Sequence, residues 1–418
     1  MGYTENLIDF IGKSTDCYHA VKTAKDRLDE NGFTELFEGD KWDVQSGGKY
    51  YVIRNSSSII AFEMPKKDFG AFMICASHTD SPSFKLKPDF EINADGCIKL
   101  SVEGYGGMIM SSWLDRPLSI SGRIVTAKDG KLETKLVNID RDLLVIPSLA
   151  IHMSRDINKG YEFNIRRDMC PIASEKNGRI EDIIAENVGV DKEEILGFDL
   201  SLYNRLRGTV LGADGEYFSA PRIDDLQCMY STLEGFLNSE SDDNVTVFAA
   251  FDNEEVGSGT KQGAKSSFLR DVLERICDNS ETYKRAVAKS FMLSCDNAHA
   301  VHPNFADKSD GTNRVYMNGG IVIKYNANQR YTTDAVSEAV VKYVCKNAGV
   351  PYQMYANRSD IPGGSTLGNL SNEKVSLNTA DIGLAQLAMH SSYETAGSRD
   401  TEYMVKMIKE FYKTEIVL

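Results

Sequence analysis

Three apolar stretches decide the fold of this chain: AFMICASHTD at 71–80, VTVFAAFDNEE at 245–255 and SFMLSCD at 290–296. Each begins as a buried strand and runs directly into His, Glu-Glu or Asp. In open parallel sheets, ligands and catalytic groups gather outside the carboxyl ends of the strands. One charged residue after a buried run is ordinary loop chemistry, but three such strands together predict one shared site.

The regions around these strands predict an α/β domain that is interrupted by a second unit. Amphipathic helices open the chain, and another is expected at 334–349. Residues 85–219 differ, because short alternating runs punctuated by Gly, Asp and Asn are typical of antiparallel β-structure, with a helical patch at 179–197. We therefore expect an α/β domain formed by 1–84 plus 220–418, split by a β-rich insertion.

Charge and cysteine content exclude several classes of protein. The 418 residues include 47 Lys plus Arg against 61 Asp plus Glu, a net charge of −14, which argues against nucleic acid or an anionic membrane as partner. No apolar run approaches the roughly 18–20 residues of a membrane helix, and the first residues do not resemble a signal peptide. Eight scattered cysteines without a CxxC pair fit a reducing compartment and no zinc finger. We expect a cytoplasmic protein.

The side chains that follow the strands are of the kind that binds metal ions in hydrolytic sites. His and carboxylates without thiolates favour Zn²⁺, with Co²⁺ or Mn²⁺ as alternatives. Two ions about 3.5–4 Å apart need one bridging carboxylate and roughly two further ligands each. Five residues supply that number: His78, Asp224, Glu255, Asp296 and His390. For the Asp224-Asp225 pair, a plain helix N-cap explains the local sequence equally well.

The Glu254-Glu255 pair and Asp80 suggest how such a site would work. Neighbouring residues in a turn point in different directions, so one glutamate can bind metal while the other faces the substrate water. A carboxylate in that position can take the proton of the water and pass it to the leaving amine. Asp80, two residues after His78, could hold the second nitrogen of the imidazole ring.

The chain resembles M18-family metallo-aminopeptidases, in particular the aspartyl aminopeptidase branch. The matching segments occur in the family's order from the first third of the chain to its end. They are SHTDSPSFKLKP (77–88), IPSLAIHMSRDIN (146–158), APRIDDLQC (220–228), FDNEEVGSGTKQGA (251–264), SCDNAHAVHPNF (294–305), GIVIKYNANQRYTTDAVSEA (320–339), DIPGGSTLG (360–368) and LAQLAMHSSYET (384–395).

The resemblance implies a role for each of the candidate residues. Asp224 would bridge two zinc ions, and Glu254 would be the general base, with Asp80 supporting His78. The other ligands would divide between the ions, with His78 and Asp296 on one and Glu255 and His390 on the other.

Further residues match family positions that act on substrate. His152 would reach the active site of a neighbouring subunit and help stabilise the reaction intermediate, and Lys324 would meet an acidic substrate side chain. His299 would form part of the active-site wall, and Gly364 would allow close approach of backbone to substrate. At 358–368 the chain has RSDIPGGSTLG, where aspartyl aminopeptidases commonly carry a Cys-Gly-Thr-Thr version of this turn, which weakens the prediction of an acidic preference.

The implied fold is a mixed-sheet zinc-peptidase catalytic domain split by a β-rich dimerisation domain, in agreement with the two units described above. The implied activity is removal of N-terminal Asp or Glu from peptides, by water activated between two metal ions. The family assembles as homo-oligomers, a dodecamer built from dimers. An aminopeptidase of the same fold that prefers neutral N-terminal residues is the main alternative.

Two other classes of protein remain to be distinguished. The run Gly257-Ser258-Gly259 with Gly263 imitates a dinucleotide-binding fingerprint, but its spacing is one residue too long and the preceding carboxylates would repel a pyrophosphate. A non-catalytic shell or cargo protein of the same fold would have lost a ligand or the base. None is lost here, so the sequence favours the enzyme.

Overall fold

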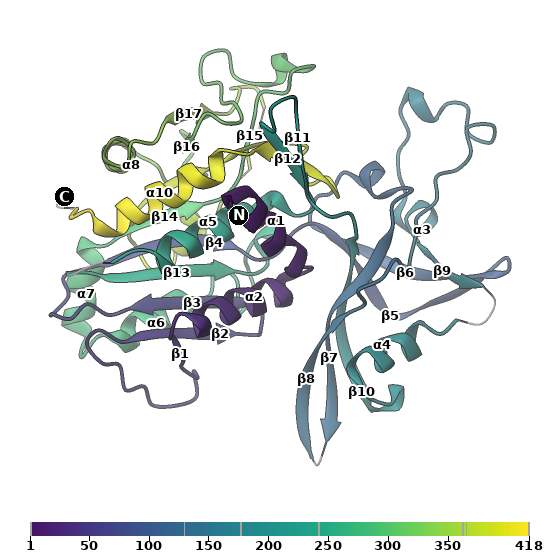
Figure 1. Ribbon diagram of the computed structural model, residues 1–418, viewed down its shortest axis with the longest axis horizontal. Helices are drawn as coiled ribbons and strands as arrows, with labels where there is room; N and C mark the ends of the chain where they lie inside the picture. The colour runs from purple at the N-terminus through teal and green to yellow at the C-terminus, as the bar shows by residue number, and fades with distance from the viewer. Residues whose placement is uncertain are drawn as a thin grey trace.

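The computed structural model describes residues 2–416, apart from 129, 176–177, 241–242, 362 and 365. A large sheet with helices on both faces forms one part of the molecule, and a smaller, twisted sheet extends beside it (Figure 1). The predicted α/β class with mixed sheets is confirmed.

The large sheet has nine strands, and its four central strands are parallel. Across the sheet the order is β1 (Thr34–Glu35), β2 (Lys49–Arg54), β3 (Ser58–Glu63), β13 (Val245–Phe251), β4 (Phe72–His78), β14 (Phe291–Cys295), β18 (Asn378–Gly383), β16 (Ile321–Tyr325) and β17 (Tyr352–Ala356). The three strands predicted from the apolar stretches are β4, β13 and β14. They are adjacent, with β4 in the middle, so their carboxyl ends share one edge.

Helices cover both faces of this sheet (Figure 1). One face carries α1 (Tyr3–Lys13), α2 (Cys17–Glu30), α5 (Ile223–Leu237), α8 (Ala335–Ala348) and α10 (Asp400–Lys413). The other carries α6 (Phe268–Ile276), α7 (Ser280–Lys289) and α9 (Leu367–Ser371). In β4, Cys75 packs into the first core and Ile74 into the second. Because both faces are buried, the central strands are apolar throughout instead of alternating.

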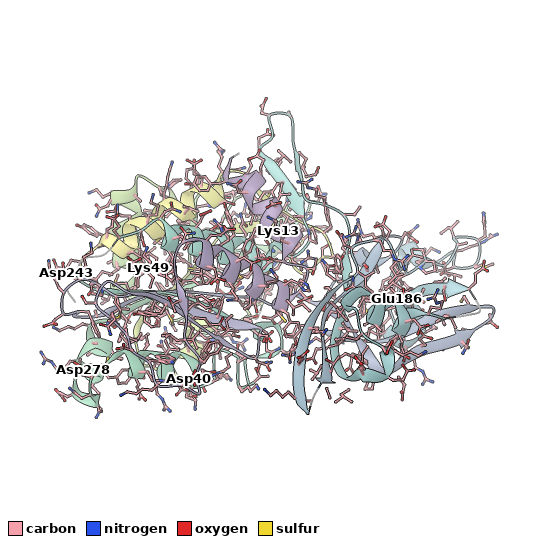
Figure 2. The ribbon with its side chains drawn as sticks, turned by 60° about the horizontal axis from the view of Figure 1, so that its bottom comes forward. Lys13, Asp40, Lys49, Glu186, Asp243 and Asp278 are labelled. Carbon is pink, nitrogen blue, oxygen red and sulfur yellow. The ribbon has the colours of Figure 1, made fainter. Side chains whose placement is uncertain are left out.

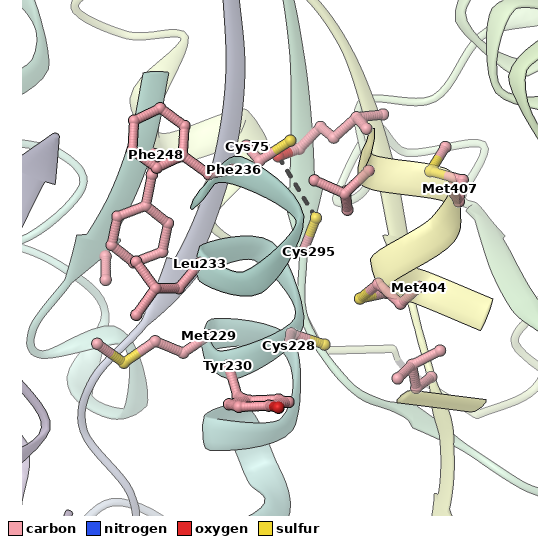
Figure 3. Close-up of a cluster of buried hydrophobic side chains, with 14 of the residues drawn as sticks. Cys75, Cys228, Met229, Tyr230, Leu233, Phe236, Phe248, Cys295, Met404 and Met407 are labelled. Carbon is pink, nitrogen blue, oxygen red and sulfur yellow. Dashed lines mark hydrogen bonds between the residues drawn. The ribbon is translucent and has the colours of Figure 1, made fainter. Parts of the chain in front are cut away.

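The first core lies between the sheet, α5 and α10. Figure 3 shows Leu233 and Phe236 of α5 facing Phe248 of β13, with Met404 and Met407 of α10 on the opposite side of α5. This packing fixes α5 against the sheet. The start of α5, where Asp224 lies, is thereby held at the carboxyl edge of the central strands.

The smaller sheet is antiparallel throughout, as the alternating runs predict. Its order is β8 (Lys131–Asn138), β7 (Leu118–Lys128), β10 (Ile195–Asn204), β5 (Ser83–Ala94), β6 (Cys97–Tyr105) and β9 (Ile172–Glu175). It has its own hydrophobic core, and α3 (Ile165–Asp168) and α4 (Ile180–Val188) accompany it. The helical patch expected at 179–197 is only half helical, because Gly189 ends α4 in a left-handed conformation (φ 69°) and β10 begins at Ile195.

A third sheet of five strands joins segments from distant parts of the chain. Its order is β11 (Thr209–Leu211), β12 (Tyr217–Ala220), β20 (Glu394–Gly397), β19 (Ala385–Leu387) and β15 (Ala298–His299). Short 3₁₀ turns lie at Met110–Trp113, Ile157–Lys159, Lys192–Glu194, Glu254–Val256 and Ala306–Lys308. The limits of the insertion at 85 and 219 stay a prediction. β11, inside those limits, pairs with β12, which ends at Ala220 and in turn pairs with β20.

Charged side chains cover the outside of both parts. Figure 2 labels Asp40, Asp243, Asp278 and Glu186, all exposed, at the periphery of the molecule. Among the described residues, no helix combines the length and the apolar character that crossing a bilayer requires. All eight cysteines are free thiols.

Candidate metal centre

The carboxyl ends of β4, β13 and β14 bring the predicted residues together. His78 is the last residue of β4 and lies opposite Phe251, the last residue of β13. The turn Glu254–Val256 follows β13, and Asp296 follows β14. Ligand atoms of His78, Glu254 and Glu255 lie within 4.8 Å of one another. The convergence predicted from the sequence is therefore observed.

Two further groups of side chains meet at Asp224. One contains His78, Asp224, Asp225 and Asp296, and the other Asp224, Glu255 and His390, with ligand atoms within 4.8 Å in each. Asp224 Oδ1 is 3.4 Å from His78 Nε2, and Asp224 Oδ2 is 3.5 Å from His390 Nε2. His390 Nε2 is also 3.4 Å from Glu255 Oε2. The two oxygens of one carboxylate thus face two different histidines.

The backbone at the start of α5 aims Asp224 into this position. Arg222 is left-handed (φ 57°), and Asp224 has a non-helical ψ of 110°. Asp225 follows with its side chain fully buried, and its Oδ2 accepts a hydrogen bond from His78 N at 3.1 Å. Asp225 therefore holds the backbone of His78, while Asp224 faces both histidine rings.

Asp80 connects several of these residues. Its carboxylate accepts the backbone N–H groups of Glu254 and Glu255, each at 3.1 Å. The same carboxylate accepts Tyr105 OH at 2.5 Å. His78 Nδ1 is 3.0 Å from the Asp80 carbonyl oxygen and 3.4 Å from its carboxylate. The hydrogen bond of His78 Nδ1 thus goes to the backbone carbonyl of Asp80 and not, as expected from the sequence, to its carboxylate, while the carboxylate fixes the turn that carries both glutamates.

The electrostatics of the site fit a bound cation. Burial and neighbouring carboxylates raise the pKa of Glu254 to about 8, against the opposing effect of His78. Burial, and then the charge of Asp224, hold the pKa of Glu255 well above its usual range. Burial lowers the pKa of His390, but Asp224 and Glu255 outweigh it and raise that pKa to about 10. The carboxylates repel one another, and a divalent cation would remove that repulsion.

Unpaired polar atoms support the same conclusion. Asp224 Oδ1, Asp225 Oδ1 and Glu255 Oε1 are buried without a hydrogen-bond partner. Unpaired buried acceptors are costly, and oxygen and imidazole donors are ligands that Zn²⁺ and related ions accept. The residues present therefore fit a divalent metal centre.

The other site residues predicted from the sequence are Lys324, His299, Gly364 and His152. Lys324, on β16, is 2% exposed and donates to Asn297 O at 2.8 Å, with Nζ 3.5 Å from Asp296 Oδ2. His299 and Gly364 line the same cavity of about 370 Å³. His152 is exposed in the segment that leads to α3, which extends away from the nine-stranded sheet (Figure 1). The structure places His152 outside the three groups of ligand side chains, two of which contain Asp224.

Two residues of the site were missed from the sequence. Tyr105 ends β6 with no signal except its position beside two glycines. Glu394 is 2% exposed and binds the backbone of Asp224 and His390. The signal for Glu394 is weak: an acidic residue within a short strand, four residues after His390.

Known proteins resemble this chain over nearly its whole length. A family model described as aminopeptidase I zinc metalloprotease (M18) matches residues 10–412. A probable M18 family aminopeptidase 2 of Clostridium acetobutylicum is 45% identical over 98% of both chains. A chain in a cryo-EM structure of the Ape4 and Nbr1 complex superposes with a TM-score of 0.95 at 35% identity, covering 98% of this chain and 85% of that one. A chain of the S. cerevisiae mApe1 dodecamer superposes with a TM-score of 0.86 at 29% sequence identity, covering 98% of this chain and 96% of that one.

Proposed function

Because the chain belongs to the M18 family of zinc aminopeptidases, we propose that it binds two divalent ions and removes N-terminal Asp or Glu from peptides, as a member of the aspartyl aminopeptidase branch. The observation that carries the two-ion proposal is Asp224. Its two oxygens lie 3.4 Å and 3.5 Å from His78 and His390, so one carboxylate is shared by two groups of ligands.

The proposed ligands divide as the shared carboxylate suggests: His78 and Asp296 on one side of Asp224, Glu255 and His390 on the other. Zinc is the proposed metal, with cobalt or manganese as alternatives. When bound, such ions polarise the scissile carbonyl and lower the pKa of a coordinated water. Asp80 and Asp225 hold the backbone of Glu255 and His78, respectively, so these ligands are oriented before an ion binds.

Glu254 is the proposed general base. Its backbone N–H is fixed by Asp80 at 3.1 Å, beside the ligand Glu255. The carboxylate of Glu254 would accept a proton from the attacking water and deliver it to the departing amine. His152, contributed by a second copy of the chain, would donate to the oxygen that gains negative charge on the carbonyl.

Lys324 supports the proposed preference for acidic residues. The pKa of its ammonium is raised, because Asp296 outweighs the lowering effect of burial, so the group carries a charge inside the protein. An ammonium has three donors, of which Asn297 O takes one and Asp296 lies near another. The remaining donor can meet a substrate carboxylate.

Assembly is part of the same proposal. A related structure is described as the dodecamer of S. cerevisiae mApe1, and we extend a dodecamer built from dimers to this chain, with residues 85–219 as the dimerisation unit. Such an assembly would bring His152 to a neighbouring active site. The free cysteines support a reducing compartment such as the cytoplasm.

Turnover of aminoacyl p-nitroanilides and short peptides, with and without chelator, tests the proposal. Chelator-sensitive release of N-terminal Asp or Glu, with Leu and Ala slow, is expected. Fast release of Leu or Ala would instead establish the neutral-specific alternative. No turnover by protein that holds two ions would point to a shell or cargo protein.

Glu254→Gln tests the general base. Turnover should fall by about 10²–10⁴-fold with the metal content unchanged. The control is Glu402→Gln on α10, which breaks only the pair with Lys406 at 2.7 Å. Wild-type turnover by the Glu254 variant with both ions bound would refute the role.

A further inference from the structure

Glu394 holds two of the proposed metal ligands by their backbones. It begins β20, is 2% exposed, and lies opposite Ala220, the last residue of β12. Its Oε2 accepts Asp224 N at 3.0 Å, and its Oε1 accepts His390 N at 2.7 Å. Gln386 Nε2 lies 3.2 Å from Oε1 and orients the carboxylate.

The two backbones that Glu394 binds are not held by regular structure. Asp224 departs from helical geometry at the start of α5. His390 is left-handed with a φ of 67°, and Ala388, two residues earlier, is left-handed with a φ of 56°. For residues other than glycine such conformations are costly and persist only when the surroundings impose them. The Glu394 hydrogen bond, together with that between His390 Nδ1 and Gly107 O at 2.6 Å, imposes the conformation of His390.

We infer that Glu394 is a positioning residue of the metal centre, which fixes Asp224 relative to His390 through their N–H groups. This inference rests on the proposed function, because it needs those two residues to be ligands. Glu394 makes the distance between Asp224 and His390 independent of the ion. Ligand-orienting partners of this kind typically contribute 10–100-fold to metal affinity.

Glu394→Gln tests the inference with little change in volume. An amide has one oxygen and one NH₂ group, so it can accept only one of the two N–H groups and must turn its own donors toward the other. Affinity for Zn²⁺ or Co²⁺, measured by competition with a chelator, should fall about 10–100-fold. The loss should be greatest for the ion held by His390, and Co²⁺ absorption spectra report the geometry of each site.

Two further variants distinguish a positioning role of Glu394 from an effect of its charge and from general damage to β20. Glu394→Asp keeps the charge but withdraws the carboxylate, and should weaken metal binding as the glutamine variant does. Thr395→Val, the next residue along β20, breaks only the 2.7 Å hydrogen bond to Ser219 and should leave metal affinity unchanged. Wild-type affinity in both Glu394 variants would overturn the inference.

The wild-type protein distinguishes failure of the inference from failure of the proposed function. If the wild type binds two ions and hydrolyses peptides but the Glu394 variants bind metal equally well, only the inference falls. If the wild type binds no ions, the proposed function falls with it. Should Glu394→Gln not fold, Gln386→Met removes only the donor to Glu394 and should weaken binding several-fold. Unchanged affinity in that variant would also refute the inference.

Discussion

Replacing Tyr105 by Phe removes one oxygen atom from the framework around the metal centre. That hydroxyl donates to Asp80 Oδ2 at 2.5 Å and accepts from Asn253 Nδ2 at 2.9 Å. Asp80 in turn binds the backbone of Glu254 and Glu255. The substitution thus tests whether the hydrogen bonds around Asp80 are as strong as their distances indicate.

The expected cost follows from the two contacts. A hydrogen bond to a charged group contributes about 1.5–3 kcal/mol and a neutral one about 1 kcal/mol, so Tyr105→Phe should lower the free energy of unfolding by about 2–4 kcal/mol. Asp80 Oδ2 keeps the N–H of Glu255, so the glutamate turn should remain in place. Peptidase turnover should therefore fall less than about tenfold, which corresponds to about 1.4 kcal/mol.

Guanidinium unfolding of the wild type and the variant measures this cost. The matched control is Tyr393→Phe, whose hydroxyl donates only to the neutral Arg207 O at 2.7 Å. The control should cost about 0.5–1.5 kcal/mol. A cost for Tyr105→Phe equal to that of the control, or below it, would show that the Asp80 contact contributes nothing beyond an ordinary hydrogen bond.

Other expected outcomes concern metal removal, pH and helix capping. If the free metal concentration is 100 times the Kd of a site, removing that metal with a chelator should lower the free energy of unfolding by about 3 kcal/mol. Thermal unfolding with and without chelator measures this loss. Burial raises the pKa of Asp16, but hydrogen bonding to His19 outweighs burial and leaves the pKa below its usual value. Its contribution to stability is therefore present above about pH 4, and the deficit of Asp16→Asn, measured by denaturant unfolding from pH 7 downward, should shrink as pH falls below that value. Asp334 caps α8 through two backbone N–H groups, so Asp334→Ala should cost about 1 kcal/mol, with Asp334→Asn near wild type in the same unfolding assay.

Much of the fold could be predicted because its signals are local. The central strands are buried on both faces, which gives the continuous apolar runs that mark β4, β13 and β14. The helix expected at 334–349 is observed as Ala335–Ala348, with Asp334 and Gly349 as its caps. The helical patch expected at 179–197 is longer than the observed helix, because a left-handed Gly189 ends α4 although the apolar pattern continues beyond it.

The candidate site was predictable only in part. His78 ends β4, Asp296 directly follows β14 and Glu255 lies in the turn after β13, so their convergence follows from the parallel sheet. Tyr105 and Glu394 belong to other sheets, and each binds a residue far away in the sequence, Tyr105 to Asn253 and Glu394 to Asp224. Neither periodicity nor spacing indicates such pairs, because they arise from how the sheets pack together.

The sequence by itself determined the α/β class and the kinds of side chain that gather at the candidate site, because both depend on residue type and on short-range periodicity. Only the tertiary structure decided that Asp224 faces His78 with one oxygen and His390 with the other. It also decided that Lys324 lies buried against Asp296. These relations depend on strand order, on the backbone at the start of α5 and on packing between sheets, which are set by contacts between residues distant in the chain.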